Sequence, residues 1–191
     1  MLTSDFDYIL PPELIAQEPP AERGISRMLV LHRDTGEIEH KHIADIVDYL
    51  TPKDLMVFND TRVFSARAFG TWEDTPGKVE VLFIEPSVRL PGAWTVMCKS
   101  SRPMRPGAVM LLANGEIKAT VQAKYEDGKV DVTVASAGDF FEILDKYGVP
   151  PVPPYIHRES GDERVEMDKE RYQTVYSKEE GGCLKHNCTR R

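Results

Sequence analysis

The sequence predicts a small all-β domain, either a barrel or a sandwich, inserted between two pieces of a second domain. Between residues 63 and 138, six short strand-like segments follow one another with tight turns, which is typical of such β folds. Outside this region, residues 43–50 before it and residues 139–147 after it have apolar residues at helical spacing. With 191 residues, of which 41% are hydrophobic, the chain is long enough to bury a core.

The composition indicates a soluble protein of a reducing compartment. The formal net charge of -7 argues against unspecific polyanion binding, so an RNA partner would need a local basic patch. The longest apolar run, residues 108–113, is far shorter than the roughly 20 residues of a membrane span. The first residues lack the features of a signal peptide, and three cysteines are too few for a disulfide scaffold. We therefore expect a cytoplasmic protein without membrane contact.

The residues before position 63 predict short elements. Pro11 and Pro12 suit the first turn of a helix that extends to Ala16. Residues 28–32 and 37–40 predict the two strands of a hairpin, with Gly36 in the turn. Two further elements are predicted in order, a helix over 43–50 and a strand over 54–58.

The predicted strands of the inserted domain cover residues 63–70, 79–85, 94–99, 109–113, 117–125 and 130–134. Asn114-Gly115 and Asp127-Gly128 are hairpin turn signals between the last three. A helix follows over Asp139–Tyr147, with Gly148 as its C-cap. The proline-rich residues 149–156 are predicted to be extended, and a charged segment follows them.

The most suggestive chemistry lies at the predicted boundary near residue 63. Asp60, Thr61 and Arg62 present a carboxylate, a hydroxyl and a guanidinium side by side at the end of a predicted strand. The alternative is an Asx turn with an ion pair that only orders the boundary, and the residue chemistry alone favours that alternative.

A basic loop is the best candidate for RNA contact in this acidic chain. Lys99, Arg102 and Arg105 lie close together, with prolines that stiffen the loop. Such cations contact RNA phosphates, although an ordinary solvated loop is the alternative. The proline-rich segment also contains overlapping P-x-x-P patterns, for which a rigid strut is a commoner role than recognition by a binding domain.

We predict no metal site. His40 and His42 share a strand face, but no third ligand is evident nearby. Cys183, His186 and Cys188 offer three soft ligands, but they lack the fourth ligand and the spacing of a zinc site. There is also no glycine-rich loop of the dinucleotide-binding or methyltransferase kind.

Several blocks, in order, resemble the S-adenosylmethionine:tRNA ribosyltransferase-isomerase family of queuosine biosynthesis. The blocks are Asp5-Phe-Asp-Tyr8 with Leu14-Ile-Ala-Gln17, Arg23 with Ser26-Arg27, Phe58-Asn-Asp-Thr-Arg-Val63, Gly77-Lys-Val-Glu-Val-Leu82, Pro150 to Ile156, and Arg171-Tyr-Gln-Thr-Val-Tyr176. The resemblance extends to about Gly182.

The resemblance implies an α/β large domain interrupted by a small β-barrel domain. The large domain would comprise residues 1–62 and 139–182, the barrel domain residues 63–138, and residues 183–191 would be a tail outside the family pattern. It further implies a monomer that uses S-adenosylmethionine as ribosyl donor, without a metal. The acceptor would be 7-aminomethyl-7-deazaguanine at the wobble position of tRNA, and the products epoxyqueuosine, adenine and methionine.

This chemistry needs a base beside the sulfonium, a proton donor for adenine, and cations for RNA. We assign Asp60 as the base, Tyr155 as the proton donor and Arg62 as an anchor for a substrate carboxylate or phosphate, from residue chemistry. The further substrate-binding candidates are Asn59, Thr61, Tyr8, Arg23, Ser26 and Arg27, and the RNA-binding candidates are Lys99, Arg102 and Arg105.

The sequence departs from the family pattern after Gly182. The family continues into a long C-terminal half, whereas this chain reads Cys-Leu-Lys-His-Asn-Cys-Thr-Arg-Arg and stops. We therefore expect a truncated and inactive product. The alternative function is a non-catalytic RNA- or protein-binding module based on the β-barrel.

Overall fold

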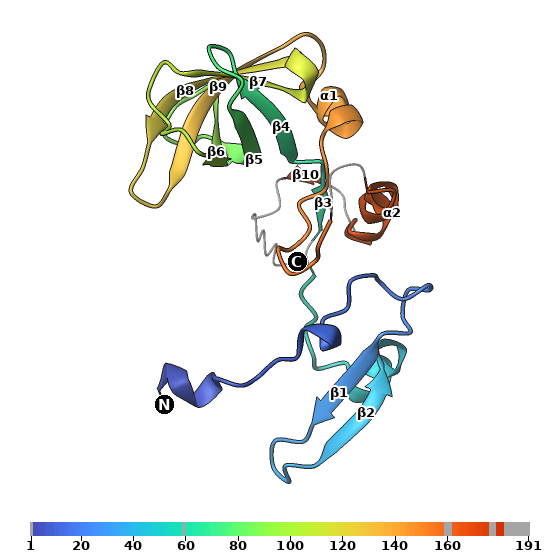
Figure 1. Ribbon diagram of the computed structural model, residues 1–191. Coiled ribbons are helices and arrows are strands. Elements are labelled where there is room, and N and C mark those ends of the chain that lie inside the picture. Colours follow the sequence, from blue (N-terminus) through green and yellow to red (C-terminus); the bar gives the residue numbers. More distant parts are fainter. Residues whose placement is uncertain (1, 59, 159–161, 176–178, 182–191) are drawn as a thin grey trace. The chain divides into compact units, whose positions relative to one another are not determined.

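A computed structural model describes residues 2–58, 60–158, 162–175 and 179–181 (Figure 1). These residues form two compact units. One contains the described residues up to Met56 together with Tyr155–His157, and the other contains Val57–Pro154 and the described residues from Arg158 onward. Each unit is described by itself.

Six antiparallel strands form a closed barrel in the order β4-β5-β6-β9-β8-β7. They are β4 (Arg67–Trp72), β5 (Lys78–Pro86), β6 (Ala93–Ser100), β7 (Val109–Leu112), β8 (Ile117–Lys124) and β9 (Lys129–Ser136). The prediction of a small all-β domain is confirmed, and the closed order decides for the barrel over the sandwich. The predicted strand over 63–70 was partly wrong, because Phe64–Ala66 separate a short strand from β4.

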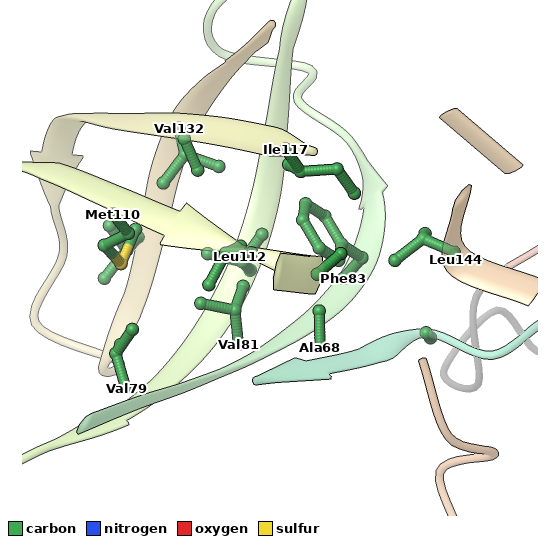
Figure 2. Close-up of a cluster of buried hydrophobic side chains, with 14 of the residues drawn as sticks. Ala68, Val79, Val81, Phe83, Met110, Leu112, Ile117, Val132 and Leu144 are labelled. Atoms are coloured by element: carbon green, nitrogen blue, oxygen red, sulfur yellow. The ribbon is translucent and has the colours of Figure 1, made fainter. Parts of the chain in front are cut away.

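The barrel is filled by the alternate residues of its strands. In β5, Val79, Val81 and Phe83 are buried, whereas Lys78 is exposed and Glu80 is half-buried between them. Figure 2 shows these apolar side chains converging in the interior. Such alternation is the pattern of strands with one buried face, and each fully buried side chain of this size contributes about 1.5–3 kcal/mol.

The barrel closes between β4 and β7, where only three residue pairs are in register, among them Gly70 with Leu112. A Cβ on Gly70 would lie 1.9 Å from the carbonyl oxygen of Leu111. The two strands can therefore approach only because residue 70 has no side chain.

Both predicted turn signals are present. Asn114 and Gly115, within the 3-10 turn η4 (Ala113–Gly115), have φ values of 57° and 88° between β7 and β8. Gly128 has φ 81° between β8 and β9. The left-handed region that these turns need is the one that Gly and Asn tolerate best.

A buried carboxylate links β6 and β9. Asp131 is fully buried and accepts hydrogen bonds from the hydroxyls of Ser87 (2.7 Å), Thr95 (2.8 Å) and Tyr125 (2.8 Å). Burial by itself raises the pKa of Asp131. The three donated hydrogen bonds together outweigh this effect, so the pKa of Asp131 lies below its ordinary value. The charged form is therefore the one that this network stabilises.

Helix α1 (Phe140–Tyr147) packs against the barrel core through Ile143 and Leu144. The Asp139 side chain caps it by accepting from the backbone N–H groups of Phe141 and Glu142, each at 3.0 Å. The predicted helix and its C-cap Gly148 are confirmed. A Cβ on Gly148 would lie 2.4 Å from the Ser65 carbonyl oxygen, so glycine also permits a close approach here.

Helix α2 (Arg164–Arg171) lies in the charged segment for which the sequence predicted no element. The residue that it buries is Asp168, which pairs with the half-buried Arg158 through Nε–Oδ2 (2.7 Å) and Nη2–Oδ1 (3.0 Å) contacts. The short strands β3 (Thr61–Val63) and β10 (Glu179–Gly181) pair in parallel beside it. Within the described ranges, no helix is long and apolar enough to traverse a bilayer.

The other unit contains the predicted hairpin, formed by β1 (Arg27–Leu31) and β2 (Ile38–His42). The helices predicted over 11–16 and 43–50 are the 3-10 segments η2 (Pro12–Leu14) and η3 (Ile43–Tyr49), and a further one, η1 (Thr3–Phe6), lies near the N-terminus. None of the described residues up to position 56 is buried, so packing does not favour the longer α-helices.

The strand predicted over 54–58 was wrong. The segment has no ladder partner among the described residues, and its apolar side chains are exposed, Leu55 by 72% and Val57 by 54%. The α/β character of the larger domain stays a prediction.

We expect Gly70→Ala to lower the free energy of unfolding by about 1–3 kcal/mol, because the new methyl group forces β4 away from β7. Urea unfolding measures the change. Gly138→Ala is the matched control, since the nearest atom to its Cβ is Ile143 Cδ1 at 4.0 Å and its φ is not positive. Equal stability of the two variants would contradict the tight closure.

We expect Asp131→Asn to destabilise the protein at pH 7 by about 1–3 kcal/mol. The new side-chain NH₂ group would face hydroxyl groups that now donate to the carboxylate, so buried donors would lose their acceptor. Since the native pKa of Asp131 is lowered, its contribution is complete above the unfolded pKa of about 3.9 and is lost as the pH falls through the native pKa. The variant should therefore lose less stability than the wild type between pH 7 and pH 3 in urea titrations. Glu126→Gln, in the neighbouring exposed turn, should leave the wild-type pH dependence intact.

Candidate functional site

A pocket of about 380 Å³ lies beside the barrel, within the same unit, where β3, α1 and α2 meet. Its polar lining residues are Arg62, Ser65, Asp145, Glu166, Lys169, Tyr172 and Gln173, and its apolar ones are Val63, Phe64, Phe141 and Pro150. This volume falls in the range of small-molecule sites, about 300–1,000 Å³. The pocket thus joins three of the sequence blocks singled out above.

Gln173 builds one wall of the pocket by pairing with the backbone of β3. The Val63 N–H donates to Gln173 Oε1 (2.8 Å), and Gln173 Nε2 donates to the Val63 carbonyl (2.9 Å). A carboxamide presents the same donor and acceptor as a peptide group. The side chain therefore takes the place of a neighbouring strand at this position.

Lys169 joins α1 to α2 at the pocket. Its Nζ donates to the carbonyl oxygen of Asp145 in the last turn of α1 (2.9 Å) and to Glu166 Oε1 (3.0 Å). Helix α2 is itself fixed by the ion pair of its buried Asp168 with Arg158. The pocket consequently has charges of both signs on helices that are held together.

Among the predicted substrate residues that the structure describes, Arg62 alone lines this pocket. Arg62 lines it, whereas Asp60 precedes β3, is half-buried and does not belong to the lining. Thr61 is the first residue of β3, and Asn59 lies outside the described residues. The candidates Tyr8, Arg23, Ser26, Arg27 and Tyr155 belong to the other unit and are exposed.

Tyr155 is held through its backbone rather than through its hydroxyl. The Tyr155 carbonyl accepts from Gln17 Nε2 (2.9 Å), and the His157 N–H donates to Gln17 Oε1 (2.9 Å). The Tyr155 side chain is 54% exposed. Gln17 and Gln173 thus use the same amide-to-backbone pairing in the two units.

The three predicted RNA-binding residues differ in their surroundings. The Arg102 guanidinium lies 4.8 Å from the Trp72 ring centroid and pairs with Asp74 at 2.5 Å. Its hydrogen bond lowers the pKa of Asp74. Lys99 and Arg105 are exposed. Arg102 therefore covers one end of the barrel, while Lys99 and Arg105 present their charges to solvent.

The potential metal ligands do not converge in the described part of the chain, where no group of three or more His, Cys, Asp and Glu could hold an ion. His40 and His42 are exposed on β2. The Cys183, His186 and Cys188 cluster lies outside the described residues. Burial raises the pKa of Cys98 to about 12, so this thiol stays protonated.

Apart from Arg62, the sequence predicted none of the residues that line the pocket, among them Asp145, Lys169 and Gln173. Gln173 lies inside the Arg171–Tyr176 block, which was a usable signal. Asp145 has a weaker one, since a carboxylate in the last turn of a helix opposes the helix dipole. Lys169 has none, because its helix was not predicted.

The larger unit thus combines a closed small barrel with a charged pocket whose volume suits a small ligand. The family model described as "Queuosine biosynthesis protein" matches residues 3–185, and the chain belongs to this family. The resemblance inferred from the sequence blocks is confirmed.

Two relatives illustrate the similarity. The chain is 45% identical, over 182 residues that make up 95% of its length, to the S-adenosylmethionine:tRNA ribosyltransferase-isomerase of Acetivibrio thermocellus. It spans about half, 51%, of that protein. The crystal structure of an S-adenosylmethionine tRNA ribosyltransferase from Thermotoga maritima is 35% identical, with a TM-score of 0.36 over 76% of this chain and 49% of that one.

We expect Gln173→Glu to destabilise the protein by about 1–3 kcal/mol, because a carboxylate cannot donate to the Val63 carbonyl. Urea unfolding and hydrogen exchange of the Val63 amide measure this change. Gln122→Glu is the control, since the Thr133 hydroxyl at 2.9 Å can donate where it now accepts, and the contact of Gln122 with the Thr120 carbonyl is long, at 3.4 Å. A loss of stability in Gln122→Glu as large as in Gln173→Glu would contradict the pairing argument.

Proposed function

We propose that this chain forms the N-terminal part of an S-adenosylmethionine:tRNA ribosyltransferase-isomerase. The reaction transfers the ribosyl moiety of S-adenosylmethionine to 7-aminomethyl-7-deazaguanine in the tRNA anticodon and isomerises it, which gives epoxyqueuosine. The observation that carries the proposal is the 45% identity to an enzyme of that name. The convergence of Arg62, Pro150 and Gln173 from three separate sequence blocks on one pocket supports it.

The residue roles follow from what the reaction requires. A base removes a proton from the carbon next to the sulfonium, which Asp60 is suited to do as a half-buried carboxylate beside β3. A proton donor assists the departure of adenine, and the phenol of Tyr155 can supply that proton. Arg62 anchors a substrate anion in the pocket. Asn59, Thr61, Tyr8, Arg23, Ser26 and Arg27 stay candidates for further substrate contacts.

The barrel is the proposed contact surface for tRNA. Residues 63–138 contain nine Lys and Arg against eight Asp and Glu, whereas the whole chain has 24 against 31. The negative charge therefore resides outside the barrel, and Lys99 and Arg105 are exposed on it. Exposed cations on a surface without net negative charge suit phosphate contacts. Arg102 contributes to the same surface from its place over Trp72.

The proposal includes an α/β large domain made of residues 1–62 and 139–182, with residues 63–138 inserted. The parallel pairing of β3 with β10 supports this division, because it joins segments from both sides of the barrel. Helices α1 and α2 contribute the helical part. A cytoplasmic monomer without a metal fits such an enzyme.

A second candidate is a non-catalytic RNA- or protein-binding module based on the barrel. The barrel has its own core and local hairpins, which supports an independent role.

Equilibrium binding to the purified chain tests the proposal. We expect both radiolabelled S-adenosylmethionine and tRNA carrying 7-aminomethyl-7-deazaguanine to bind, and Arg62→Ala to weaken binding of S-adenosylmethionine about tenfold. Arg33→Ala, in the exposed hairpin turn, is the control and should bind as the wild type does. Mass spectrometry of the tRNA nucleosides then tests turnover. Binding of tRNA alone would favour the second candidate, and binding of neither ligand would contradict the proposal.

A further inference from the structure

Asp145 is an exposed carboxylate that lines the pocket. It lies in the last turn of α1, where the helix dipole disfavours a negative charge, and it lines the pocket. Its carboxylate makes no hydrogen bond or ion pair with the part of the chain that the structure describes. A residue that breaks a local rule without a structural gain is a candidate for function.

Lys169 provides an oriented positive charge next to Asp145. Two of its three N–H donors are engaged, one by the Asp145 carbonyl and one by Glu166, and these contacts fix the ammonium at the pocket. The third donor has no partner among the described residues. Arg62 adds a guanidinium to the same lining. The pocket therefore combines an unpaired carboxylate with cationic donors.

The remaining lining is aromatic. Phe64 and Phe141 meet edge to face, with ring centroids 5.4 Å apart, and Tyr172 is a third ring in the lining. Aromatic rings hold an aliphatic chain and also attract cations that cannot form hydrogen bonds. A zwitterionic amino acid with a cationic, apolar side chain has the matching chemistry.

We propose that the pocket binds the methionine end of S-adenosylmethionine. The Asp145 carboxylate receives the ligand's ammonium, and Lys169 together with Arg62 receives its carboxylate. The sulfonium and its methylene groups lie along Phe64 and Phe141. The identity of the ligand, including its sulfonium, rests on the proposed function, whereas the lining itself matches the broader class of zwitterionic α-amino acids with an apolar or cationic side chain.

Binding of three probes to the purified chain tests this assignment. S-adenosylmethionine contains the whole ligand, S-methyl-L-methionine lacks the adenosine, and 5′-methylthioadenosine lacks the amino acid. In Asp145→Asn and Lys169→Met, we expect calorimetry to give about tenfold weaker binding of the first two probes, the usual loss for one charge-assisted hydrogen bond. Binding of 5′-methylthioadenosine should not change.

Glu142→Gln is the matched control, because Glu142 is an exposed carboxylate of the same helix that does not line the pocket. It should bind all three probes as the wild type does. Asp145→Asn should melt no lower than the wild type, since it removes an unfavourable charge from the helix end. Weaker binding in this variant is therefore not a folding defect.

The outcomes separate the assignment from the proposed function. If Asp145→Asn binds S-adenosylmethionine as tightly as the wild type, the assignment is overturned and the proposed function stands. If S-methyl-L-methionine binds and responds to Asp145→Asn while S-adenosylmethionine does not bind, the pocket chemistry is supported and the proposed function fails. If a folded wild-type chain binds none of the probes, both are overturned.

Discussion

Closure of the barrel is the constraint on which the rest of the larger unit depends. Three residue pairs between β4 and β7 complete the ring, and they remove the unpaired strand edges that an open sheet would expose. Helix α1 packs against the closed barrel through Leu144, which belongs to the barrel core. Two backbone hydrogen bonds between Arg67 and Val149 join the chain after α1 to β4. The helix that holds one side of the pocket is thus positioned by the barrel.

The elements that the sequence predicted are those determined by local chemistry. Alternating apolar residues, an Asn-Gly turn and an Asp-Gly turn identify the β7-β8-β9 meander. An apolar helix face that includes Leu144, followed by the C-cap Gly148, identifies α1. The sequence did not predict helix α2, because the residue that the helix buries is the charged Asp168 and not an apolar one. Its partner, Arg158, lies before the helix. Apolar periodicity cannot detect a helix that is fixed by an ion pair. Around Leu55 the apolar residues predict a strand that does not form, because the segment has no partner strand among the described residues.

The candidate site was predictable only in part, for a related reason. Arg62 could be selected from residue chemistry alone, but its charged neighbours in the pocket, Asp145, Glu166 and Lys169, come from helices much later in the chain. Asp145 and Lys169 acquire their roles only when α1 and α2 meet, since the contact between them is a side chain on a backbone carbonyl. No spacing in the sequence encodes such a contact.

The two glutamine joints impose different limits on sequence change from those of the barrel strands. A strand pairs through its backbone, so many side chains are tolerated at most ladder positions. At Gln17 and Gln173 the side chain itself supplies the pairing, to segments 138 to 140 and 110 residues away. Asparagine is one methylene shorter, and an ionised glutamate has no donor for the carbonyl, so neither replaces glutamine without losing a hydrogen bond. The barrel surface therefore tolerates substitution more readily than these two positions do.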